Sequence, residues 1–208
     1  MKHLNQFITE YIIKKKLDKP IDSEDHYEYY PKTKNDLIYN IKNLVKQDIY
    51  DFNCIDTSAI TDMFNLFDDI KIRKNFDVSR WDVSNVKDMS SMFNGCKYFN
   101  CDLSNWDVSN VEDMLCMFKY CKNFEGKGLE NWNVGKVTDM DSMFENCKKL
   151  DCDLSNWDVH NVISMKYMFQ NCEKFKAEGL DKWNISKVRH MDFMFDNCMK
   201  LKKIPSWY

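Results

Sequence analysis

The chain has 208 residues, of which 44% are hydrophobic, 14% aromatic and 30% charged, and its formal net charge is -3. This composition excludes a mainly disordered chain, and the length is sufficient for one or two domains with a hydrophobic core. The small negative charge gives no electrostatic reason to expect binding to nucleic acid or to an anionic membrane.

The first 53 residues predict two amphipathic helices. Apolar side chains recur at helical spacing between Leu4 and Ile12, and again between Leu37 and Val45. Thr33 and Asp36 have the spacing of a capping box before the second helix. We therefore expect residues 1–53 to form a helical segment whose second helix covers the end of the domain that follows. The acidic, tyrosine-rich stretch 18–30 is expected to be a loop.

Targeting signals are absent from the sequence as it stands. The segment 1–19 lacks the apolar stretch of a signal peptide, and no run of about 18 apolar residues could span a membrane. The nine cysteines are an odd number, which favours reduced thiols over a disulfide framework. These features predict a cytoplasmic protein.

Residues 54–208 are dominated by an internal repeat. Tryptophans recur at intervals of 25, 26, 25, 26 and 24 positions, and a phenylalanine column recurs at 26, 25, 26, 25 and 26. A fixed period of this size predicts a solenoid, here of about six coils. The tryptophans are Trp81, Trp106, Trp132, Trp157, Trp183 and Trp207, and the phenylalanines are Phe67, Phe93, Phe118, Phe144, Phe169 and Phe195.

Within one coil the apolar pattern changes its period. The spacing in 86–96 is that of one face of a short helix, whereas alternate residues are apolar in 99–103, as in a half-buried strand. Asn85 and Asp88 have the spacing of a helix capping box, with Asp in place of Glu. The sequence thus predicts an α/β solenoid like that of leucine-rich repeats, with a short helix and a short strand in each coil. Every second coil carries an extra residue next to glycine, at 125–129 and 176–180, which predicts a bulge or tight bend.

The repeat also carries a family resemblance. The string Leu-Ser-Asn-Trp-Asp-Val-Ser-Asn-Val-x-Asp-Met-x-x-Met-Phe-x-x-Cys at 103–121 returns with small changes at 154–172. It resembles the bacterial surface protein repeat of about 26 residues, a member of the BspA-like leucine-rich repeats. The resemblance covers roughly 54–208, and Ser164 and His190 depart from it where the pattern has Asp. It implies a repeat scaffold without catalysis, associated with a bacterial surface or a phage particle.

Neither metal binding nor catalysis is indicated. Cysteines are separated by four residues at 96/101, 116/121 and 147/152, but most of them occupy repeat positions of the core, where a free cysteine acts as a small hydrophobe. Zinc sites need closer pairs brought together. The aspartates that recur on successive coils suit backbone capping better than a single catalytic site. We expect no enzyme activity, no metal and no cofactor.

The candidate binding residues are large apolar side chains at variable positions of the predicted helix. Such residues at solvent-facing positions mark a partner surface, although they are also expected where a side chain only covers a local gap. The candidates are Leu115, Cys116, Ile163, Tyr167 and Phe193. A second set, at the end of the last coil, consists of Ile204, Trp207 and Tyr208.

Two functions follow from these sets. The first is a scaffold that binds a protein partner of unknown identity through the outer face of the coils. The alternative is a structural component that self-associates into a homo-oligomer through its C-terminal coil. Neither function involves nucleic acid or a membrane span.

Overall fold

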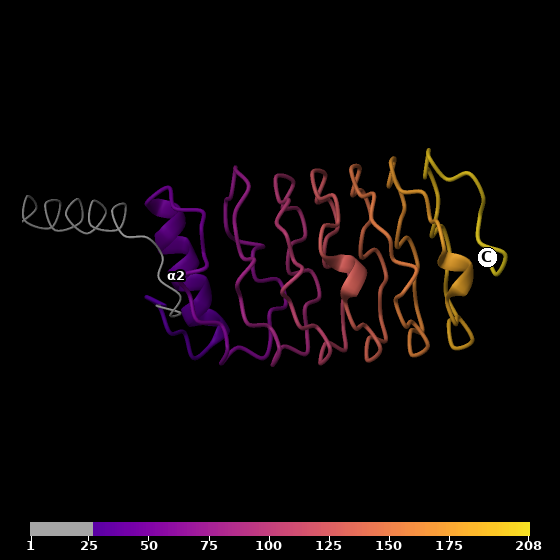
Figure 1. Cartoon of the computed structure of the whole chain (residues 1–208). Helices are drawn as coiled ribbons and strands as arrows, with labels where there is room; N and C mark the ends of the chain where they lie inside the picture. Colours follow the sequence, from indigo (N-terminus) through magenta and orange to yellow (C-terminus); the bar gives the residue numbers. More distant parts are fainter. Residues whose placement is uncertain (1–26) are drawn as a thin grey trace, which may run out of the picture.

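The computed structural model describes residues 27–208, which form one continuous stack of coils. Helix α2 (Lys34–Lys46) lies across one end of the stack, and the C-terminal residue lies at the other (Figure 1). Two short 3-10 helices, η1 (Leu129–Asn131) and η2 (Leu180–Lys182), lie within the coils. The predicted helix at 4–12 and most of the predicted loop at 18–30 lie outside the described residues. In the described part of the chain, no helix is long and apolar enough to cross a bilayer.

Helix α2 forms where the sequence predicts it. The Thr33 side chain accepts a hydrogen bond from the amide of Asp36, and the Asp36 carboxylate accepts one from the amide of Thr33. This capping box satisfies amides that the first helical turn leaves unpaired. The buried face of the helix joins the hydrophobic core of the coils through Leu37, Ile41 and Leu44.

The coils do not contain the predicted helices. Segment 86–96 runs through successive turns, and neighbouring coils meet at single parallel bridges such as the one that joins Asp88 to Asp113. Ser91 and Gly95 have φ angles of 55° and 77°, in the left-handed region, which interrupts a right-handed helix. The predicted helix was wrong because a series of turns can bury apolar residues three and four positions apart, which is also the spacing of a helix face.

The predicted strand at 99–103 is also not found, and the regular elements of the described coils are only η1 and η2. The alternation of buried side chains in this segment is nevertheless present, because Phe99, Cys101 and Leu103 are all buried. The extra residue of alternate coils is accommodated where η1 and η2 begin. There Gly128 and Gly179 adopt φ angles of 93° and 78°, so the predicted tight bend is confirmed.

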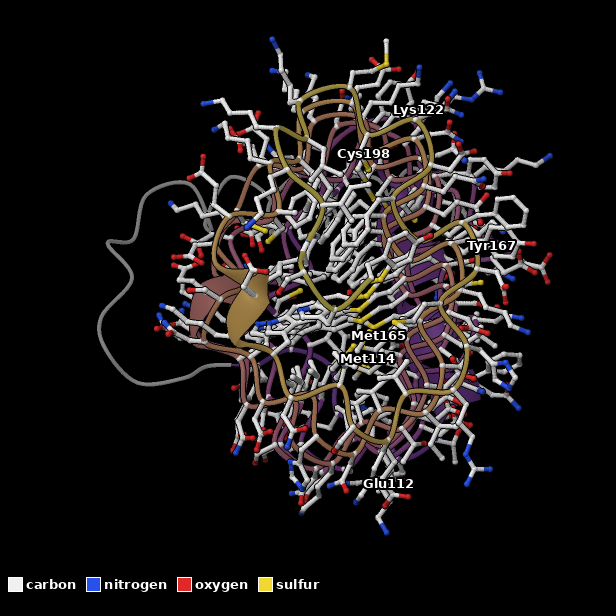
Figure 2. All side chains as sticks on the ribbon, turned by 90° about the vertical axis from the view of Figure 1, so that its right-hand side faces the viewer. Glu112, Met114, Lys122, Met165, Tyr167 and Cys198 are labelled. Atoms are coloured by element: carbon white, nitrogen blue, oxygen red, sulfur yellow. The ribbon has the colours of Figure 1, made fainter. Side chains whose placement is uncertain are left out.

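The phenylalanine and tryptophan columns form the core, as predicted. The rings of Phe118 and Phe144 stack with centroids 5.6 Å apart and planes 2° from parallel. Trp132 and Trp157 stack in the same manner at 6.4 Å and 3°. Each indole also donates a hydrogen bond to a carbonyl of the preceding coil, as Trp157 does to Leu129 at 2.7 Å. Figure 2, seen along the stack, shows these rings and the methionine sulfurs filling the interior.

Smaller side chains join successive coils. All nine cysteines are free, and the Cys147 thiol donates to the carbonyl of Phe118 at 3.0 Å, a contact repeated on other coils. Asp82 forms a turn, because its carboxylate accepts the amide of Ser84. Asn85 makes no capping box. Its amide group instead donates to the carbonyl of Ser58 on the preceding coil, at 2.9 Å.

Candidate functional site

The predicted binding residues do not form one surface. Cys116, Tyr167 and Phe193 occupy the same position of the repeat, with φ angles of 56°, 58° and 57°, and Ser142 occupies it on the coil between Cys116 and Tyr167. Leu115 lies in the adjacent column. Ile163 belongs to a different column, in which Glu112 holds the same position two coils earlier. Figure 2 shows Glu112 and Tyr167 on different sides of the coil. A single helical face would have placed Ile163 near Tyr167, and the structure does not bring these two residues together.

Exposure in this column is greatest on the last coil. Cys116 and Tyr167 are half-buried and Ser142 is buried, whereas Phe193 is 56% exposed; Leu115, in the adjacent column, is half-buried. The rings of Tyr167 and Phe193 stack with centroids 5.4 Å apart and planes 3° from parallel. Earlier coils carry Ser91 at the equivalent position. Among the described coils, this column therefore carries a stacked aromatic pair at its last two positions, where the outer ring, Phe193, is exposed.

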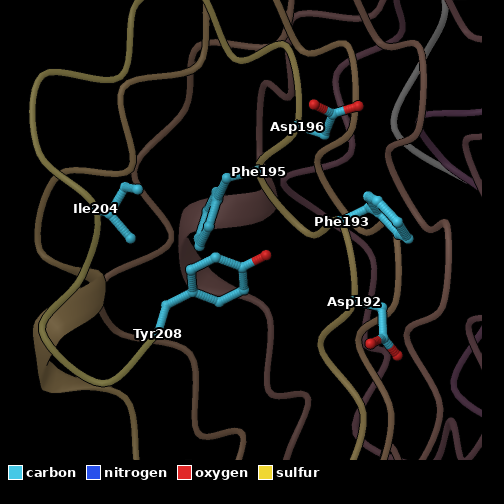
Figure 3. Close-up of a pocket in the computed structure, with 6 residues that line it drawn as sticks. All are labelled: Asp192, Phe193, Phe195, Asp196, Ile204 and Tyr208. Carbon is cyan, nitrogen blue, oxygen red and sulfur yellow. The ribbon is translucent and has the colours of Figure 1, made fainter.

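A shallow, largely open hollow adjoins Phe193 on the last coil (Figure 3). Apolar surface is exposed on both sides, because Ile204 is 51% exposed and Tyr208 is 46% exposed. The Tyr208 ring meets Phe195 edge-on, with centroids 5.3 Å apart. The residues that line the hollow are Asp192, Phe193, Phe195, Asp196, Ile204 and Tyr208.

Trp207 differs from the other two residues predicted for self-association. Its indole donates to the carbonyl of Leu180 at 2.9 Å and stacks on Trp183 with centroids 6.3 Å apart. Trp207 therefore completes the core column of tryptophans. Ile204 and Tyr208, by contrast, are exposed and line the same hollow as Phe193, with Ile204 on the far side of Tyr208 from Phe193 (Figure 3).

The titratable groups of the outer face serve the backbone. Asp88, Asp113 and Asp139 are joined by parallel bridges, and each carboxylate accepts the amide two residues further on. Burial, with the neighbouring carboxylates, raises the pKa of Asp113 and of Asp139. Burial also raises the pKa of the Cys116 thiol, which makes it a poor nucleophile at neutral pH. No group of three or more His, Cys, Asp or Glu residues suited to a metal ion occurs in residues 27–208.

Sequence reasoning missed the hollow itself. Phe195 was assigned to the core column, and no motif in the sequence singles out Asp192 or Asp196. Only the three-dimensional arrangement shows that these side chains surround one concave surface with Ile204 and Tyr208. The signal in the sequence was the late appearance of aromatic residues, Tyr167 and then Phe193, at a position that earlier coils fill with smaller side chains.

Comparison with known proteins identifies a family. A family model described as a Mycoplasma protein of unknown function, DUF285, matches residues 34–128 and 117–208. The chain belongs to this family. The DUF285 match supports the coarser part of the sequence-based resemblance, a bacterial surface-protein repeat family, and it includes α2 as well as the coils. No curated protein and no solved structure matches the chain.

Proposed function

We propose that this DUF285 protein is a non-catalytic scaffold that binds a protein partner at the C-terminal end of its stack. The surface in question, here called the end patch, consists of Tyr167, Phe193, Ile204 and Tyr208. The observation that supports the proposal is the exposure of several large apolar side chains around one hollow. Large apolar patches on soluble proteins commonly mark interaction sites, and aromatic residues contribute much of the binding energy at interfaces.

We also propose that the coils are a variant of the BspA-like leucine-rich solenoid. The conserved spacing of leucine, tryptophan, methionine, phenylalanine and cysteine within this one chain supports this relationship. Solenoids of stacked repeats present extended surfaces, and their function is generally binding. A partner that contacts the end patch would therefore meet a rigid support, since the rings beneath it belong to the continuous core.

The structure offers a matched pair of variants to test binding at the end patch. Phe193→Ser removes an exposed ring and restores the residue that Ser91 provides at the equivalent, left-handed position. The control is Tyr120→Asn, which removes a ring that is 43% exposed on an interior coil and restores the residue found at Asn146. Both variants are expected to keep the fold.

The experiment compares proteins captured from cells of the source organism by the parent chain and by both variants, with quantitative mass spectrometry. We expect at least one protein to be retained by the parent and by Tyr120→Asn, but to fall at least about tenfold with Phe193→Ser, as expected when an interface anchor is truncated. Identical sets of bound proteins for all three chains would refute binding at the end patch.

A further inference from the structure

The hydrogen bonds between coils are directional. The amides of Met89, Ser91, Phe93 and Gly95 donate to carbonyls of the following coil at 2.7–3.1 Å. The carbonyls of the intervening residues accept amides of the preceding coil, as Ser90 accepts that of Asn65. Along residues 89–95 and their equivalents, called here the ladder, one edge of each coil presents only donors and the other presents only acceptors. The direction reverses just before the ladder, where the amide of Glu112 donates to the carbonyl of Lys87 on the preceding coil.

The last coil leaves its donor edge unpaired. The equivalent amides are those of Met191, Phe193, Phe195 and Asn197, and none of them has an acceptor within residues 27–208. The four amides at the same positions one coil earlier are all bonded, at 2.8–2.9 Å. Unpaired amides in a row are a template for another chain, and they border the hollow of the end patch.

The directionality restricts what can bind there. Two copies of this edge cannot pair through these amides, because donors would face donors. The edge of a regular β-strand is also a poor match, because it presents both amides and carbonyls. The acceptor edge of a second copy is covered by α2, from which Lys34 donates to the carbonyl of Phe64 at 3.2 Å and to Asp62 at 2.8 Å. The complementary surface is the uncovered carbonyl edge of a coil of the same kind.

Side chains at the edge add a charge requirement. Asp192 and Asp196 line the hollow and would repel an anionic occupant, whereas neutral carbonyls are acceptable. Lys119 and Glu145 occupy the position of Asp196 on two neighbouring interior coils, and they form an ion pair at 2.8 Å. An added coil with basic residues opposite Asp192 and Asp196 would make the same kind of pair.

We propose that the donor edge of residues 191–197 binds the carbonyl edge of a repeat coil carried by a different polypeptide, with basic side chains facing Asp192 and Asp196. This inference rests on the proposed function and specifies the partner of the end patch. Four backbone hydrogen bonds would set the register, and the two aspartates would select the partner. The binding mode resembles strand addition, but with all donors on one side.

The first experiment asks whether the edge accepts such a coil. The full chain is extended by a copy of residues 185–208, which places a further tryptophan 24 positions after Trp207. The copy carries Asp192→Lys and Asp196→Lys, and a control extension has the same composition in shuffled order. Amide hydrogen exchange of the four donors is measured by NMR. We expect exchange at least about tenfold slower with the ordered extension than with the shuffled one. Equal rates with both extensions would overturn the proposal.

The second experiment separates this inference from the proposed function. A protein captured by the parent chain should no longer be captured by the chain with the ordered extension, because the original donor edge is occupied and the new edge carries lysines that would repel basic side chains of the partner. It should still be captured with the shuffled extension. Capture by the ordered extension, together with slowed exchange, would show that the partner binds elsewhere and would overturn the inference. The proposed function would fail separately, if Phe193→Ser had no effect on capture.

Discussion

Two glycines that precede the 3-10 turns allow a sharp test of how tightly the coils pack. Gly128 and Gly179 both have positive φ angles, and a side chain on either residue would meet the preceding coil. A Cβ at 128 would lie 2.2 Å from the amide nitrogen of Ser104 and 2.6 Å from the carbonyl carbon of Leu103. A Cβ at 179 would lie 2.6 Å from the Cβ of Ser155. The obstacle is therefore backbone in one case and a single side-chain atom in the other.

This difference sets the expected energies. The left-handed conformation costs alanine about 1 kcal/mol relative to glycine at either site. Overpacking adds roughly 1–3 kcal/mol, with the larger value at 128 because the backbone of the preceding coil cannot rotate away. We expect Gly128→Ala to lower the free energy of unfolding by about 3–4 kcal/mol and Gly179→Ala by about 2–3 kcal/mol.

A second substitution distinguishes the two obstacles. Ser155→Gly removes the atom that obstructs position 179, so the double variant should recover about 1–2 kcal/mol as a coupling energy. Ser104→Gly leaves the obstructing backbone atoms of position 104 in place, so its coupling with Gly128→Ala should be near zero. Urea unfolding of the two double-mutant cycles measures both values. Equal coupling energies in the two cycles would refute the packing argument.

Three further predictions concern single residues. Burial and the neighbouring Asp88 raise the pKa of Asp113, so this group stabilises the fold below its ordinary pKa and loses that contribution as pH rises through the raised value. Asp113→Asn should therefore stabilise the protein by roughly 0.2–1 kcal/mol at pH 7 and have no effect near pH 3, in urea unfolding at both pH values; greater stabilisation at pH 3 would contradict this. Trp157→Phe removes the donor to the Leu129 carbonyl and should cost about 1–3 kcal/mol in the same assay, and a neutral result would argue against the bond. Cys147 is buried, which holds its pKa well above the usual value, so it should react with a thiol reagent only after unfolding, as peptide mapping can show.

The sequence predicted the large-scale repeat correctly and the local backbone incorrectly. The period, the two aromatic columns and the capping box at Thr33 depend on residue identity, and all three are present. The helix at 86–96 was predicted from spacing alone. Apolar residues three and four positions apart face inward in a helix. They also face inward in a series of turns in which residues with positive φ, such as Ser91 and Gly95, change the direction of the backbone. The pattern of buried side chains therefore cannot show whether an amide bonds within its coil or to the next one.

The same ambiguity limited the prediction of the site. On a helix, Ile163 and Tyr167 would be four residues apart on one face. In the structure they belong to separate columns on either side of the β-bridge at Ser164. The amide of Ile163 donates to the preceding coil, whereas that of Tyr167 donates to the following coil. Phe193 was correctly predicted to be exposed. That inference came from a large apolar residue at a position that other coils fill with Ser, and it holds whether or not the backbone is helical. A left-handed preference was readable only at Gly95 and at the asparagines of the same position, such as Asn146.

The directional ladder gives the two ends of the stack different chemistry. Aligned peptide groups leave partial negative charge at the acceptor end and partial positive charge at the donor end, as in a helix, although here the alignment runs across the coils. At the acceptor end, the ammonium group of Lys34 supplies both a donor and a compensating charge. The donor edge needs oxygen acceptors, which the flanking Asp192 and Asp196 do not supply to the four amides. A lysine side chain can pair with the acceptor end of such a stack but not with the donor end, because it has no acceptor. The proposed partner at the donor end would therefore add new hydrogen bonds without breaking existing ones.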